Sequence, residues 1–227
     1  MADPPLFKKY DRYKGSTYRA YNFKMPDRYD SCFWIGFCQA NRWDEAVCAE
    51  LGFEIASLRI LDVGCATGRL LSRLAQAGAR KLAGVDLAPR ILDVTRRKLA
   101  DRQVEADLRA ADAEDTLPWP SDSFDVATLT GVLHHFYRPG DALREIHRVL
   151  RPGGRLLVLD PDFFPPVRQI ANLYLRVAPH DGDFRFYSRR KAIRLLESVG
   201  LRHSWSRRVG LWAYFITTVK TGASSRQ

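Results

Sequence analysis

From Leu58 onward the chain alternates short apolar runs with amphipathic segments, and this alternation constrains the fold more than any other feature. The apolar runs have the length and composition of strands, and the segments between them have helical periodicity. Such an order is typical of βαβ units, which build a parallel sheet with helices on both faces. We expect strands over residues 59–63, 81–86, 106–111, 124–130 and 155–160, and helices over 68–77, 89–100 and 140–150.

After Pro161 the alternation lapses into a Pro-rich, aromatic segment that continues to about Tyr187. A last helix is expected over 188–198, followed by strands over 201–208 and 211–220. Together these elements predict an α/β fold: a Rossmann-like, doubly wound, mostly parallel sheet of seven strands. We expect one domain over residues 58–220, with 161–190 as a substrate-side insertion and 221–227 as a flexible tail.

Residues 1–57 have a different composition, and we interpret them as an aromatic, basic N-terminal arm and lid. This segment holds 11 of the 26 aromatic residues before position 44, interleaved with lysine and arginine. Tyr10 to Tyr29 are expected to be lid residues. Phe33, Trp34, Phe37 and Trp43 are interpreted as the inward face of a helix that packs on the sheet.

Composition bounds the class of protein. Apolar residues make up 46% of the chain and charged residues 27%, which is ordinary for a globular domain. The polar start and the absence of a long apolar stretch predict a cytoplasmic protein without a membrane span. The four cysteines contain no C-x-x-C pair, so we expect reduced thiols rather than a zinc site.

The formal net charge is +10, and much of the excess lies between Arg185 and Arg208, where Glu197 is the one acidic residue. Such a balance is compatible with nucleic acid, an acidic membrane surface or an anionic small substrate, and composition does not choose among them.

The strongest local motif is Leu61-Asp-Val-Gly-Cys-Ala-Thr-Gly-Arg-Leu70, a strand that enters a small-residue turn and then a helix. Such a turn brings backbone N–H groups close to a ligand. The next strand ends in Asp86, where a ribose diol would need an acceptor. A third acidic strand end, Ala111-Asp-Ala-Glu114, follows. The three together predict a nucleoside-containing ligand.

A dinucleotide is not expected here, because the fingerprint positions for glycine are occupied by Gly64, Ala66 and Arg69. Asp62 would repel a pyrophosphate but could receive a positively charged amino group.

The ordered motifs Asp62-Val-Gly-Cys-Ala-Thr-Gly68, Gly84-Val-Asp-Leu87, Ala111-Asp-Ala113, Phe124-Asp-Val, Val132-Leu-His-His-Phe136 and Leu150-Arg-Pro-Gly-Gly154 resemble the class I S-adenosylmethionine-dependent methyltransferases. The chain is most similar to the small-molecule branch that includes quinone-biosynthesis methyltransferases. The resemblance covers roughly residues 58–160. It implies S-adenosyl-L-methionine as cofactor and a small, anionic or aromatic methyl acceptor.

The resemblance also implies a role for each motif. The backbone from Gly64 through Cys65 and Ala66 to Gly68 would border the methionine part, with Asp62 nearby. Asp86 would bind the ribose hydroxyls and Leu87 would pack on the adenine. Asp112 and Ala113 would meet the edge of the adenine. The residues from Thr130 to Val132 would line the sulfonium side of the cofactor. Ala66 and Ala88 depart from the family pattern, where Gly and a capping Ser are common.

His134 and His135 follow the fourth strand and are the candidate bases, should the acceptor need to lose a proton. In the alternative, purely structural interpretation, one imidazole is buried and hydrogen-bonded and the other covers the cofactor. No third ligand stands at recognisable spacing, so no metal is expected.

Three functions remain open: a small-molecule O- or C-methyltransferase, which we favour, a nucleic-acid or protein methyltransferase, and a non-catalytic module with the cofactor fold.

Overall fold

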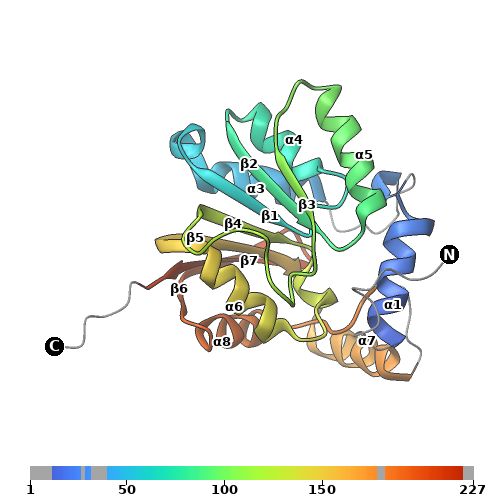
Figure 1. Cartoon of the computed structure of the whole chain (residues 1–227). Helices are drawn as coiled ribbons and strands as arrows, with labels where there is room; N and C mark the ends of the chain where they lie inside the picture. The colour runs from blue at the N-terminus through green and yellow to red at the C-terminus, as the bar shows by residue number, and fades with distance from the viewer. Residues whose placement is uncertain (1–11, 27–28, 32–39, 178–181, 222–227) are drawn as a thin grey trace.

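The computed structural model describes residues 12–26, 29–31, 40–177 and 182–221 (Figure 1). Seven strands form one sheet in the order β3-β2-β1-β4-β5-β7-β6. Strand β7 runs antiparallel to its two neighbours, and the other pairs are parallel. The strands are β1 (Arg59–Val63), β2 (Lys81–Asp86), β3 (Asp107–Ala110), β4 (Phe124–Thr130), β5 (Leu150–Pro161), β6 (Leu201–Val209) and β7 (Ala213–Lys220). The expected Rossmann-like sheet is confirmed.

Helices cover both faces of the sheet, as expected (Figure 1). Leucines of α4 and α5 join Trp43 of α3 in one apolar cluster, whereas α6 and α8 contribute to a second cluster on the other face. These helices are α3 (Ala40–Leu51), α4 (Arg69–Gln76), α5 (Pro89–Ala100), α6 (Pro139–Val149) and α8 (Arg189–Glu197).

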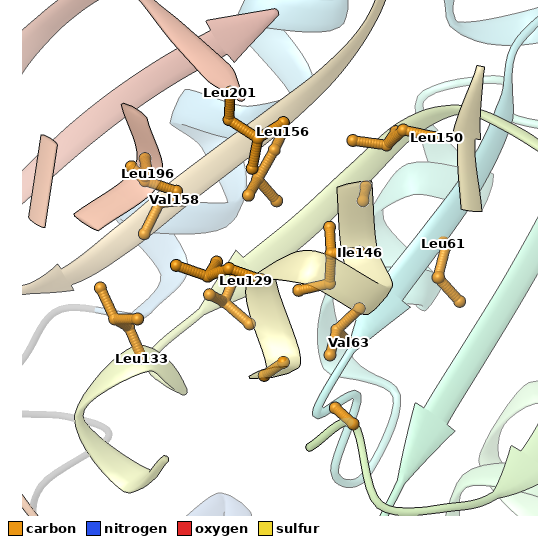
Figure 2. Packing of buried hydrophobic residues seen from close by; sticks show 14 of the residues in the cluster. Leu61, Val63, Leu129, Leu133, Ile146, Leu150, Leu156, Val158, Leu196 and Leu201 are labelled. Atoms are coloured by element: carbon orange, nitrogen blue, oxygen red, sulfur yellow. The ribbon is translucent and has the colours of Figure 1, made fainter. Parts of the chain in front are cut away.

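Figure 2 shows the second cluster, in which Leu129 of β4 and Val158 of β5 lie between side chains of the helices and of the neighbouring strands. Ile146 of α6 and Leu196 of α8 are fully buried there. Leu143 and Ile146 lie one turn apart on α6, and both pack in this cluster. Burial on both faces explains why the central strands are continuously apolar.

One boundary differs from the expectation. A helix was expected over 140–150 and the fifth strand over 155–160, with Pro152-Gly-Gly between them, yet α6 already ends at Val149 and β5 starts at Leu150. The motif instead lies inside the strand: Phe124 pairs with Leu150 and Val126 with Arg155, so β5 carries extra residues there. Gly153 supports this irregularity with a φ of 75°, a conformation that glycine adopts without strain.

The segment after β5 contains a helix that was not expected. The Pro-rich, aromatic sequence forms α7 (Pro165–Val177), which begins with prolines at positions that tolerate a missing N–H. Val167, Ile170 and Tyr174 recur at helical spacing. This pattern indicates a helix only weakly, because no α7 residue is buried.

The N-terminal segment contains α1 (Arg12–Arg19), which continues as a π-helical turn over Ala20–Lys24, and a 3₁₀ turn over Tyr29–Ser31. Two further 3₁₀ turns span Gly52–Ala56 and Leu133–His135. Trp43 is 4% exposed, which confirms that it packs inward. The other positions expected on this inward face, Phe33, Trp34 and Phe37, lie outside the described residues. So does Tyr10, which was expected in the lid. None of the described helices is both long and apolar enough to cross a bilayer.

Candidate active site

The loop between β1 and α4 shows why the sequence needs glycine there. Gly64 has a φ of 72°, and its N–H and that of Cys65 donate to the carbonyl of Val85. A Cβ on Gly64 would lie 2.5 Å from a methyl carbon of Val132. Gly68, with a φ of 70°, occupies the N-cap of α4. The loop is therefore bound to β2 and closely approached by the chain after β4.

Asp86, at the end of β2, holds this loop through hydrogen bonds. Its two carboxylate oxygens accept the N–H groups of Ala66 and Ala88, at 3.0 Å each. Burial raises the pKa of Asp86 to about 6, against the opposing effect of these backbone donors. The carboxylate is still ionised at neutral pH, and each oxygen keeps a lone pair for a hydroxyl of a ligand.

A cavity lies beside the loop at the carboxyl ends of β1 and β2, the place where open α/β sheets bind ligands. Of the residues named from the sequence, it is lined by Gly64, Ala66, Asp86, Leu87, Asp112, Ala113, Val132 and His135. Asp62, Cys65, Gly68, Thr130 and His134 are not among its lining residues. Sequence spacing alone does not separate these two groups, because neighbouring residues face opposite sides of a loop or strand.

Asp62 lies beneath the loop rather than in the cavity wall. It is 3% exposed and accepts a hydrogen bond from the Thr128 hydroxyl at 2.7 Å. Burial raises the pKa of Asp62 to about 7. Cys65 is also buried, and its sulfur lies 2.9 Å from where a Cβ on Gly84 would stand. Burial raises the pKa of the Cys65 thiol, so this cysteine is an inert packing residue.

The far end of the cavity contains a buried ion triad that the sequence did not reveal. Lys14 of α1 lies 2.5 Å from Asp112 Oδ2 and 2.8 Å from Glu114 Oε2. The other Asp112 oxygen accepts the Glu114 N–H at 2.8 Å. An adenine amino group would share or replace the Lys14 contact. Lys14 was one of many basic residues in the arm, and only the fold singles it out.

Aromatic residues of the N-terminal segment cover the cavity, and Tyr18, Tyr21 and Tyr29 belong to its lining. Besides Lys14, further contacts join the segment to the domain: Asn22 accepts the Arg90 N–H, and Thr67 donates to Asp30. About 100 Å³ of free space remains in the cavity beneath these side chains.

His135 is the imidazole that faces the cavity. Its Nδ1 lies 2.6 Å from the Gly182 carbonyl, and its Nε2 lies 3.5 Å from the Tyr21 hydroxyl. The carbonyl can only accept, so Nδ1 carries the proton and Nε2 keeps its lone pair. Burial, followed by the charge of His134, lowers the pKa of His135 to about 4. His135 is thus a neutral acceptor at physiological pH.

His134 is buried behind it and is charged. Its Nδ1 lies 2.9 Å from Asp160 Oδ1, and its Nε2 lies 3.4 Å from Asp183 Oδ1. Burial alone would lower its pKa, but the carboxylates of Asp160 and then Asp183 raise the pKa of His134 to about 10. The two imidazoles therefore differ in charge although they are adjacent in sequence.

The fold brings Asp183 to both histidines, with Oδ1 also 3.5 Å from His135 Nδ1. The spacing argument against a metal missed this third potential ligand, which is 48 positions further along the chain. The short contact of His135 Nδ1 to the Gly182 carbonyl and the ionic contacts of His134 already use these atoms. The cluster as described is an ion-pair and hydrogen-bond network.

Comparisons with known proteins agree with this geometry. Residues 61–158 match the family described as "Methyltransferase domain". Among curated relatives, the demethylmenaquinone methyltransferase of Thermus thermophilus is 39% identical over 137 residues, which are 60% of each chain. The ubiquinone biosynthesis O-methyltransferase of Xanthomonas oryzae is 36% identical over 105 residues, 46% of this chain and 44% of that one. The chain thus spans about half of the length of these relatives.

Among solved structures, an S-adenosylmethionine-dependent methyltransferase from Aquifex aeolicus superposes with a TM-score of 0.65. It covers 94% of this chain and all of its own at 19% identity, which supports the fold alone. Together with the family match and the curated relatives, this likeness agrees with the ordered motifs of the sequence. Residues 61–158 thus match the methyltransferase-domain family, and the sheet and the ordered motifs are those of the class I S-adenosylmethionine-dependent methyltransferases.

Proposed function

We propose that this protein transfers a methyl group from S-adenosyl-L-methionine to a quinone-type small molecule, at a hydroxyl oxygen or an activated ring carbon. The observation that carries the proposal is one cavity that joins the Gly64 loop, the Asp86 carboxylate and the neutral face of His135. The two curated relatives, whose names refer to quinone methylation, support the acceptor class.

The residues present fit the cofactor. Asp86 offers ionised oxygens for the ribose hydroxyls, beside the positive-φ backbone of Gly64 and Ala66. Leu87 and Ala113 supply apolar walls for the adenine, and Asp112 supplies an acceptor for its amino group. Asp62 supports the loop from beneath through Thr128. When bound, the cofactor supplies an electrophilic methyl group.

The residues around the histidine pair would prepare the acceptor. His135 Nε2 points its lone pair at the Tyr21 hydroxyl and can take a proton from an acceptor hydroxyl in that position. Gly182 fixes the required tautomer through its carbonyl. His134 acts as a positioning residue: Asp160 holds it, and its charge adds to the effect of burial in keeping His135 neutral. Val132 and the lid tyrosines exclude water, which aligned displacement at a desolvated carbon requires.

The nucleic-acid alternative receives less support. The aromatic residues Tyr18, Tyr21 and Tyr29 line the cavity, and they are therefore not free to form an open stacking platform for bases.

The decisive experiment incubates the protein with methyl-labelled S-adenosylmethionine and either a demethylated quinol, a phenolic quinone precursor or total RNA. We expect label in a quinone-type product, and mass spectrometry of that product then assigns the oxygen or carbon. Label in RNA or in protein alone would overturn the proposed acceptor. Absence of S-adenosylhomocysteine binding in calorimetry would overturn the catalytic function as a whole.

A further inference from the structure

A second hollow lies beside the first and shares no lining residue with it. This groove of about 740 Å³ lies between the start of α6 and the length of α8. Its aromatic lining residues are Tyr137, Phe184 and Tyr187, and its basic lining residues are Arg185, Arg190, Lys191 and Arg194. None of its lining residues in the described part of the chain is acidic. We call it the basic groove.

The four cations of the basic groove are not neutralised by the protein. Within the described residues, none of them has a carboxylate at ion-pair distance. In contrast, the neighbouring Arg138 pairs with Asp115 and Asp141. The Arg185 guanidinium, followed by partial burial, lowers the pKa of Lys191. Like charges so placed repel one another, and a bound anion would relieve the repulsion.

The aromatic rings give the groove an apolar side as well. Tyr137 and Phe184 meet edge to face with centroids 5.0 Å apart, and Arg185 lies 5.9 Å from the Tyr187 ring. Ser188 caps α8 by accepting the Lys191 N–H, so the start of this helix, with its positive dipole end, borders the groove. A fitting ligand has a flat or apolar body and a compact anionic head.

We propose that the basic groove is a binding site for an organic phosphate, with the phosphate among the four cations and the apolar body against the aromatic rings. The site is connected to the histidine pair, because the N–H groups of Phe184 and Arg185 both donate to the His134 carbonyl at 2.9 Å. The proposal does not depend on the methyl acceptor, since the two hollows are lined by different residues.

The test uses phenyl phosphate as the probe, with phenol and inorganic phosphate as its two halves, in ligand-observed NMR titrations. We expect saturable binding of phenyl phosphate that is tighter than that of either half. The double variant Arg185→Gln/Arg194→Gln should weaken it by about tenfold or more, because charge-assisted hydrogen bonds are lost. The control Arg80→Gln/Arg202→Gln removes the same charge from exposed positions outside the groove and should bind like the wild type.

A second readout locates the probe. Lys191 should react with an amine-directed acylating reagent faster than other exposed lysines, and phenyl phosphate should slow that reaction selectively, as measured by peptide mass spectrometry. Equal affinity in the two double variants, no saturable binding, or unprotected Lys191 would each overturn the proposal. So would binding of single-stranded RNA with a steep salt dependence, which would assign the cations to nucleic acid. Thermal unfolding of both variants identifies any loss that is due to misfolding.

Discussion

Asp86→Ala tests whether this carboxylate binds the cofactor or only holds the loop, since the structure gives it both opportunities. The carboxylate accepts the N–H groups of Ala66 and Ala88 and also lines the cavity. The ribose-binding role implied by the sequence predicts a loss of cofactor affinity. The structure adds a loss of stability, because the N–H groups of Ala66 and Ala88 both lose their acceptor at once.

The two effects have different sizes. A buried donor left without a partner costs about 1–3 kcal/mol, so two partly rehydrated donors should lower the free energy of unfolding by about 2–4 kcal/mol. Hydrogen bonds from ribose hydroxyls to a charged acceptor contribute about 1.5–3 kcal/mol, which corresponds to a dissociation constant raised about 10- to 150-fold. Asp86→Asn keeps one acceptor oxygen and should lie between the wild type and the alanine variant in both quantities.

Urea unfolding measures the first quantity, and calorimetry with S-adenosylhomocysteine measures the second. Asp93→Ala is the matched control: this aspartate is exposed on α5 and pairs only at the surface with Arg96. Its removal should change stability by less than about 0.5 kcal/mol and leave affinity unaltered. A folded Asp86→Ala protein with wild-type affinity would refute the assignment of Asp86 to the ribose, whatever its stability.

Other perturbations separate the remaining roles. His135→Gln should lower kcat on a hydroxyl acceptor by about 10² or more with unchanged cofactor affinity. The wild-type rate should not change with pH near 6.5, because the pKa of His135 is lowered to about 4. A pH–rate profile that falls with a pKa near 6.5 would contradict this. The pKa of His134 is raised to about 10, above its unfolded value of about 6.5. Its stabilisation is therefore complete below pH 6.5 and is lost as pH rises toward 10, so urea unfolding of His134→Gln should lose that part of the pH dependence. Lys14→Ala should speed hydrogen exchange in α1 but not in β4, since it removes the ion pairs that join α1 to Asp112 and Glu114. Unchanged exchange would show that the triad does not hold α1 in place.

Local pattern determined the framework of this protein. Strands β1, β2 and β4 lie where apolar runs indicated, because residues buried on both faces of a sheet must be continuously apolar. The glycine loop and Asp86 were also evident, since a positive φ at Gly64 and a carboxylate at a strand end are requirements of single positions. Helix α7 was missed because it buries none of its residues, which leaves only a weak apolar pattern.

Only the tertiary structure decided which of these residues act together. It turned His135 toward the cavity and His134 away from it, and it brought Asp160 and Asp183 from distant segments to fix opposite charges on two adjacent imidazoles. It also singled out Lys14 among many basic residues. A sequence states which side chains are present, whereas pKa and ligand contacts depend on distances of a few ångströms between segments far apart in the chain, and those distances arise only when the sheet is assembled.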